Sequence, residues 1–252
     1  MKLKWIGRDT AAILVASVLC SCGARPHHPS SPSAFKVVTI GSQIWMAENL
    51  DVDHYRSGAP IEECRDWKAF NDLGSQSKGC WISFVKSGER AGARTYDISD
   101  NDSNPVTYGT FYNYYAVHDE RGLCPVGWHV PNDGEWNALI ATLGPDAAKK
   151  AKSTTGWATG GPHGDVLVTG NGNGTNESGF NALPAGNKED DWFHWHGYAA
   201  YWWSSSEVNA EKVSLYSIYH GEPDKHKTDE LIAVSSLNYR AAASVRCVKD
   251  QP

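Results

Sequence analysis

The sequence predicts an α+β domain of short strands, two helices and long loops. Helical periodicity is confined to one region after Pro131, whereas short β-branched or aromatic runs recur along the rest of the chain. The 24 Gly and 12 Pro residues among 252 favour turns between those runs. Because residues 35–250 contain no internal repeat and no clear compositional break, we expect one domain over that range.

The domain is expected to begin with a β-hairpin. Residues 35–40 are rich in β-branched side chains, and residues 43–46 are again apolar. Gly41 and Ser42 separate the two runs, which is the spacing of a tight two-residue turn.

The clearest helix signal follows Pro131. Asn132 can cap the helix, and Glu135 can close a capping box. Gly144 then ends a periodic run whose apolar face is formed by Trp136, Leu139, Ile140 and Leu143. A second, shorter helix is expected over residues 145–152, because Pro suits the first turn and the body is rich in Ala and Lys.

The C-terminal half is rich in Gly, Asn and aromatic residues, which favours strands joined by turns. Its expected strands cover residues 200–204, 213–219, 231–235 and 244–248.

The N-terminus resembles a lipoprotein export signal. Basic residues precede the apolar run 11–19, which is too short to span a bilayer. The run Leu-Cys-Ser-Cys-Gly (19–23) resembles a bacterial lipobox with Cys22 as the lipidated residue, since Cys20 lacks a small residue before it. We therefore expect a signal peptide over residues 1–21, with an ordinary secretory signal as the alternative, and a Pro- and Ser-rich tether over residues 22–34.

Composition narrows the location and the partners. Gly23 is not an acidic residue of the kind that resembles an inner-membrane retention signal, so we expect an outer-membrane lipoprotein of the cell envelope, on either face. The net charge of −6 disfavours nucleic acid as a partner. No nucleophile elbow, metalloprotease or phosphate-binding motif is present, so we expect no enzyme, no catalytic residue and no cofactor.

Four cysteines remain after the signal, and an even number in an exported protein favours two disulfides. The sequence permits three pairings. We favour Cys64 with Cys80, which closes a local loop, and Cys124 with Cys247, which ties the start of the main helix to the last strand.

The segment 190–198 is the most suggestive candidate for a ligand site. If it is extended, Trp192, His194 and His196 face one way, and Phe193 and Trp195 face the other. Tryptophan beside His and Asp suits glycan binding, because the ring stacks on sugar C–H groups while polar groups bind hydroxyls. The alternative is that these rings cap the core, and the His pair lacks a third ligand for a metal.

Two further features are weaker candidates. In the pair Trp202 and Trp203, adjacent strand residues point to opposite faces, so one is expected in the core while Trp203 remains a candidate ligand residue. Glu222-Pro223-Asp224 resembles a calcium-binding tripeptide of C-type lectins, but its usual Trp-Asn-Asp partner is missing and a plain turn is the alternative.

Six segments in this order resemble the Fibrobacter succinogenes major paralogous domain, a family of exported bacterial proteins that are often lipoproteins. They are VTIGSQIWMAENL (38–50), YGTFYNYYAV (108–117), CPVGWHVPNDGEWNAL (124–139), NESGFNALPAGNK (176–188), YWWSSSE (201–207) and SVRCVKD (244–250). The resemblance spans the mature chain and departs from the family in residues 51–104 and 208–240.

That family is in turn similar to the C-type-lectin-like fold, including its formylglycine-generating branch. The resemblance implies a disulfide between Cys124 and Cys247, and it does not imply catalysis, because the cysteine pair of the enzymes is missing here. Since this fold hosts several functions, we expect a lipid-anchored binding module for glycan or cell-wall polysaccharide. Its expected ligand face is formed by Trp192, His194, Trp195, His196 and the loop 208–229, and the alternative is a structural or adhesion protein that recognises another protein through diversified loops.

Overall fold

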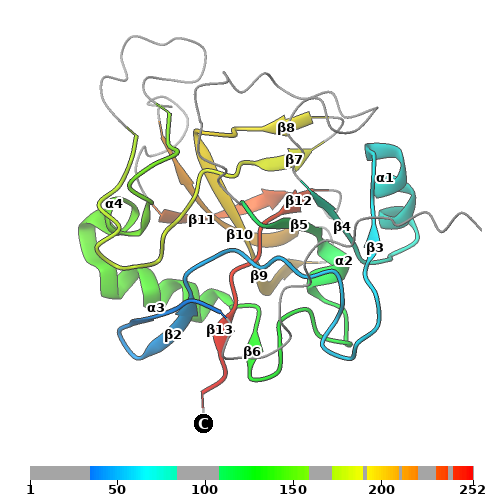
Figure 1. Ribbon diagram of the computed structural model, residues 1–252, viewed down its shortest axis with the longest axis horizontal. Helices are drawn as coiled ribbons and strands as arrows, with labels where there is room; N and C mark the ends of the chain where they lie inside the picture. Colours follow the sequence, from blue (N-terminus) through cyan, green and yellow to red (C-terminus); the bar gives the residue numbers. More distant parts are fainter. Residues whose placement is uncertain are drawn as a thin grey trace, which may run out of the picture.

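The computed structural model describes residues 35–83, 108–158, 172–189, 192–209, 212–220, 231–237 and 241–251. The expected signal peptide, Cys22, the tether 22–34, Glu222 and Asp224 lie outside these residues. Within them the chain forms a mixed α+β domain, as expected (Figure 1). In the same stretches no helix is long and apolar enough to cross a membrane.

The largest sheet joins strands from both halves of the chain. Its order is β3 (Glu62–Glu63), β4 (Cys80–Ser83), β5 (Thr110–Asn113), β12 (Ala242–Ala243), β7 (Asn187–Glu189) and β8 (Trp192–His194). The β3–β4 pair is parallel, and the other pairs are antiparallel.

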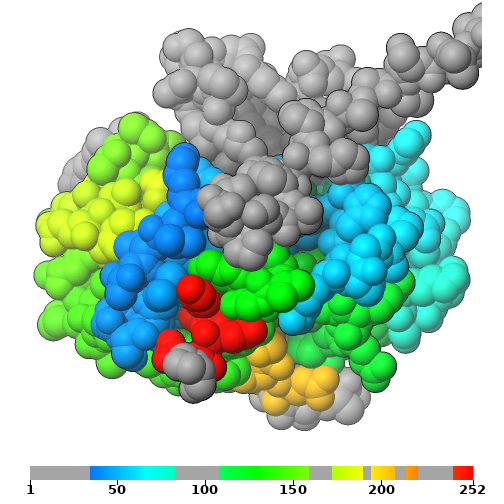
Figure 2. Space-filling model, turned by 60° about the horizontal axis from the view of Figure 1, so that its bottom comes forward, coloured from blue at the N-terminus to red at the C-terminus, as the bar shows by residue number. Residues whose placement is uncertain are grey.

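A second sheet brings the two ends of the domain together. β1 (Val37–Ile40) and β2 (Gln43–Met46) form the expected antiparallel hairpin, with Ile40 opposite Gln43. β13 (Val248–Lys249) pairs with β2 and with β6 (Trp128–His129). Figure 2 accordingly shows the red C-terminal residues beside the blue N-terminal hairpin.

The third sheet is antiparallel, in the order β11 (Leu231–Leu237), β10 (Lys212–Tyr219), β9 (Ala199–Asn209). It confirms the strands expected at 200–204, 213–219 and 231–235. The loop expected over residues 208–229 is wrong for its first part, because β10 lies within it and pairs with both neighbours.

The strand expected over residues 244–248 is also wrong. Regular pairing is limited to β12 and to β13, which begins at Val248. Between them the carbonyls bond to separate partners: Leu50 N–H donates to Val245, Met46 N–H to Cys247, and Trp203 N–H to Ser244. The segment thus connects three parts of the fold and does not follow one neighbouring strand.

The main helix is α3 (Asp133–Leu143), and it begins and ends where the sequence indicates. The Asn132 side chain accepts from Glu135 N–H, and the Glu135 side chain accepts from Asn132 N–H, which completes the capping box. Gly144 follows with a φ of +73°. The second expected helix starts as a 3₁₀ turn, η2 (Gly144–Asp146), and continues as α4 (Ala147–Ala151).

Two helices are additional to those expected. The Asp66 side chain caps α1 (Trp67–Ser75) by accepting from Ala69 N–H, and the buried Asn113 caps α2 (Tyr114–Val117) in the same way. In Figure 1, α1 lies on the opposite side of the molecule from α3 and α4.

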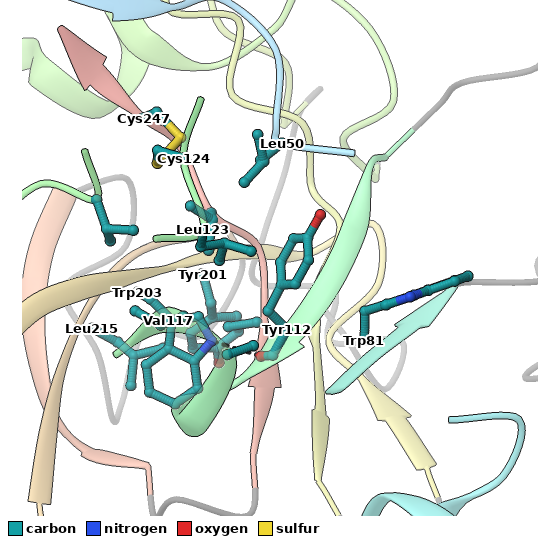
Figure 3. Close-up of a cluster of buried hydrophobic side chains, with 14 of the residues drawn as sticks. Leu50, Trp81, Tyr112, Val117, Leu123, Cys124, Tyr201, Trp203, Leu215 and Cys247 are labelled. Carbon is teal, nitrogen blue, oxygen red and sulfur yellow. Dashed lines mark hydrogen bonds between the residues drawn. A yellow bond between two sulfur atoms is a disulfide. The ribbon is translucent and has the colours of Figure 1, made fainter. Parts of the chain in front are cut away.

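The core is aromatic and lies on both faces of β9. On one face Trp136 stacks on Tyr216, with ring centroids 4.9 Å apart, and its cluster includes Trp45, Phe180 and Trp202. On the other face Figure 3 shows Trp203, Leu215 and Tyr201 with Leu123 above them, below the disulfide. That disulfide joins Cys124 to Cys247 with an S–S distance of 2.06 Å and confirms this pairing.

The expected bridge between Cys64 and Cys80 is not formed, and both residues are buried free thiols. In the parallel β3–β4 pair Cys80 lies opposite Glu62, so Cys64 is offset from Cys80 by two residues along the neighbouring strand. A hydrogen bond joins the two thiols. That hydrogen bond, together with burial, raises the pKa of the Cys80 thiol far above its usual range. The thiol therefore stays protonated and unreactive.

Candidate ligand-binding surface

The predicted aromatic segment is a strand followed by a tight turn. β8 ends at His194, and Trp195 then adopts a φ of +60°, which is rare for a bulky residue. The Trp195 carbonyl accepts from Tyr198 N–H at 2.9 Å and from Ala199 N–H at 2.8 Å. The alternation expected over residues 192–198 therefore stops at His194, because the chain reverses instead of remaining extended.

The turn of residues 195–198 is fixed by backbone hydrogen bonds to three other segments. Gly197 N–H donates to Pro184, Ala158 N–H donates to Gly197, and His220 N–H donates to Tyr198, at 2.7–2.9 Å. Gly186 also contacts this segment, and a Cβ at Gly186 would lie 2.1 Å from the His194 carbonyl oxygen. The turn is therefore held in one conformation by its surroundings.

The rings on this segment are half-buried. Trp195 packs on the core, edge-on to Tyr219 with ring centroids 6.1 Å apart. His196 packs edge-on to Tyr108 at 4.8 Å, and His194 Nε2 lies 3.2 Å from the Glu189 carbonyl oxygen. The three half-buried rings thus follow one another along the chain, and each packs on a different part of the fold.

Trp192 is placed by its backbone alone, in β8 opposite Glu189. Trp203 is a correction to the predicted site. It is fully buried, and its indole N–H donates to the Tyr112 carbonyl at 2.8 Å. The expectation that one of the two adjacent tryptophans reaches the surface is wrong because core covers both faces of β9: Trp203 lies in one cluster, and Trp202 lies in the other.

Several of the sequence motifs meet at a buried arginine. Arg246 is fully buried and donates to Asn49 Oδ1 from Nε at 3.1 Å and from Nη2 at 2.7 Å. It also donates to the carbonyls of Met46 and Phe180, and the Trp202 indole N–H donates to the same Asn49 oxygen. Burial lowers the pKa of Arg246 to about 9, although Glu48 opposes the shift. These motif residues therefore hold the fold together and do not form a surface site.

A second surface histidine is held between two carboxylates. His129 Nδ1 lies 2.6 Å from Asp250, and His129 Nε2 lies 2.8 Å from Glu135, so this contact links β6, α3 and the C-terminal segment. Partial burial acts to lower the pKa of His129, but the hydrogen bonds and charges of Asp250 and Glu135 outweigh it and raise the pKa. Across the described ranges no three His, Cys, Asp or Glu residues are grouped so that they could hold a metal ion.

The sequence reasoning missed one further surface cluster, which consists of Tyr114, Tyr115, His118 and Glu207. The Tyr114 hydroxyl donates to Glu207 Oε1 at 2.6 Å, and its ring packs on His118 with centroids 4.1 Å apart. The available signal was the aromatic run 111–115 followed by a histidine. Its partner Glu207 is distant in the sequence and only the fold brings it close.

Comparison with known proteins gives one match. The family described as the Fibrobacter succinogenes major domain matches residues 38–249, from β1 to β13. No curated protein and no solved structure matches the chain.

Proposed function

The chain belongs to the Fibrobacter succinogenes major domain family. We propose that it is a lipid-anchored binding module outside the cytoplasm. Its proposed ligand is glycan or cell-wall polysaccharide, bound through the 195–198 turn. We also propose that its fold is C-type-lectin-like. The fold proposal is supported by the disulfide from Cys124 to Cys247 and by the pairing of the first and last strands of the domain through β2 and β13.

The observation that carries the proposal is a rigid turn that presents half-buried rings. Backbone hydrogen bonds to Pro184, Ala158 and His220 fix the turn before any ligand arrives. A binding surface that is already ordered loses little conformational entropy on binding, so more of the contact energy appears as affinity.

The side chains on this surface have the chemistry that a glycan requires. A tryptophan ring such as that of Trp195 offers a flat apolar surface for the C–H face of a pyranose. The imidazole of His194 can donate to or accept from hydroxyl groups, whereas Nε2 of His196 is buried. The surface contains no grouped metal ligands among the residues that the structure describes, so this mode of binding uses stacking and hydrogen bonds.

The proposed anchor is the lipid on Cys22, which would place the module on the outer membrane. The Pro- and Ser-rich tether that the sequence predicts over residues 22–34 would separate this anchor from the domain. The proposal includes no catalytic step, cofactor or nucleic-acid partner.

The proposal is tested with a glycan and polysaccharide array that is probed with the mature chain, once with calcium and once with a chelator. We expect the protein to bind a defined glycan on the array both with calcium and with the chelator. Loss of binding in chelator would bring Glu222 and Asp224 into the site as calcium ligands. Silence in both conditions would contradict glycan binding and favour recognition of a protein.

The ligand from the array is then titrated against two variants. Trp195→Ala removes the stacking ring and should weaken binding at least about 10-fold, which corresponds to about 1.4 kcal/mol. Val126→Ala is the control, because Val126 is also an apolar side chain, is 67% exposed and belongs to neither proposed site. Equal binding by wild type and Trp195→Ala would overturn the site.

A further inference from the structure

We propose that the Tyr114 cluster is a second binding site, specific for the protonated amine of an amino sugar. The cluster consists of Tyr114, Tyr115, His118 and Glu207, and it joins α2 to the far part of β9. This inference does not depend on the 195–198 turn. Ala199 and Glu207 are eight residues apart along β9, which corresponds to about 26 Å of extended strand.

The cluster has more hydrogen-bond acceptors than donors. The Tyr114 hydroxyl is used by Glu207 Oε1, and the described residues offer no hydrogen bond to the second carboxylate oxygen of the exposed Glu207. His118 Nδ1 lies 3.1 Å from the Tyr114 carbonyl oxygen, so it is assigned as the protonated nitrogen. His118 Nε2 is then an acceptor with no partner among the described residues, but it is buried, so the acceptor open to a ligand is the second oxygen of Glu207. A ligand that fits must therefore donate.

The local charge selects a cation. The exposed Glu207 supplies the carboxylate of the cluster, whereas the neighbouring Asp119 is paired with Arg121, whose guanidinium lies 2.6–2.7 Å from its oxygens. The Arg121 guanidinium also lies over the Tyr55 ring, 4.1 Å from its centroid. The electron-rich rings of Tyr114 and Tyr115 attract a cation further.

The buried side chain of Asn113 fixes the start of α2, which carries the cluster. Asn113 is fully buried; its side-chain oxygen accepts from Ala116 N–H and from Cys80 N–H, and its amide donates to the Lys78 carbonyl. Burial and the hydrogen bond to Glu207 raise the pKa of Tyr114 to about 12, so its hydroxyl remains a donor to Glu207. Glu207 is thereby held beside the rings before a ligand binds.

An amino sugar fits this site better than a lysine side chain. The amine of a glucosamine unit is attached directly to a rigid ring, whereas a lysine ammonium must be ordered at the end of four rotatable bonds. A pyranose also brings hydroxyl donors for the remaining lone pairs of the Glu207 carboxylate. The ligand class is therefore a glycan with free, non-acetylated amino groups.

The test is isothermal titration of the full mature chain with a glucosamine tetramer and with its fully N-acetylated counterpart, in which each ammonium group is replaced by a neutral acetamide. We expect the free amine form to bind at least about 10-fold tighter. Glu207→Gln should abolish this preference, and Tyr114→Phe should weaken it. Glu120→Gln, which removes an exposed charge two residues from His118 in the sequence, should leave the preference unchanged.

Three results would overturn the assignment. Equal binding of the acetylated and free tetramers would exclude recognition of the amine. An equal loss in Glu207→Gln and Glu120→Gln would show attraction by net charge alone. Equally tight binding of tetralysine would show that the sugar ring contributes nothing. Trp195→Ala tests the turn with the array-identified glycan, and Glu207→Gln tests the Tyr114 cluster with the difference between the two tetramers, so failure of either proposal is distinguishable from failure of the other.

Discussion

Two neighbouring aromatic segments differ in what covers them. The 195–198 turn carries half-buried rings, whereas Trp202 and Trp203, a few residues further along the chain, are fully buried. Both segments are rich in the same residue types. The difference arises because β9 is packed on both faces, while the turn before it lies at the end of β8, the edge strand of its sheet. A segment rich in aromatic residues is thus a candidate binding surface only where the core does not cover both of its faces.

The largest expected effect is a loss of stability when the buried Trp203 is replaced. Trp203→Ala should lower the free energy of unfolding by about 3–5 kcal/mol, because it leaves a large cavity and an unpaired Tyr112 carbonyl. Trp195→Ala should cost only about 1–2 kcal/mol, because its ring is only partly buried. Urea denaturation of both variants measures the difference, and equal losses would contradict the comparison.

The disulfide between Cys124 and Cys247 stabilises the core cluster that buries Trp203. The double variant Cys124→Ser with Cys247→Ser should lose about 2–5 kcal/mol of stability, since the bond closes a loop with a sequence separation of 123. Calorimetry of this variant should match that of the reduced wild type. Reductant that left the melting temperature of the wild type unchanged would argue against a structural role for the bond.

The turn itself gives a smaller and sharper test. Trp195 occupies the left-handed region, which glycine adopts freely and alanine does not. Trp195→Gly should therefore be more stable than Trp195→Ala by about 1 kcal/mol. Both variants lack the ring, so both should lose the proposed glycan. Greater stability of the alanine variant would show that the backbone does not need this conformation.

The smallest effect concerns His129. Its pKa is raised in the folded protein, so its stabilising contacts are complete below pH about 6.5, the ordinary value for histidine. They are lost as the pH rises through the raised folded pKa. Because the side chain is 36% exposed, we expect less than about 1 kcal/mol.

Thermal unfolding of the wild type and of His129→Gln between pH 5 and pH 8 measures this effect. The wild type should lose its advantage over the variant as the pH rises. A stability difference between the two that did not change with pH would contradict the proposed charge pairing.

Local signals in the sequence predicted the parts of the fold that local chemistry determines. Asn132, Glu135 and Gly144 specify α3, and Gly41 with Ser42 specifies the first hairpin. The missed helix α1 had a cap at Asp66, but its apolar period is short.

Features that depend on distant partners were not predictable in this way. The strand expected at 244–248 is interrupted because its backbone bonds to residues at 46, 50 and 203. The Tyr114 cluster depends on Glu207, 93 residues away, and the burial of Trp203 depends on two core clusters that form only in the folded chain.

The two aromatic segments are expected to differ in binding: the 195–198 turn binds ligand, and the tryptophans of β9 do not. The most direct measurement is the dissociation constant of the array-identified glycan for Trp195→Ala relative to wild type, with the melting temperature recorded in parallel. We expect binding at least about 10-fold weaker with the fold retained. An unchanged dissociation constant in a folded Trp195→Ala protein would contradict this expectation.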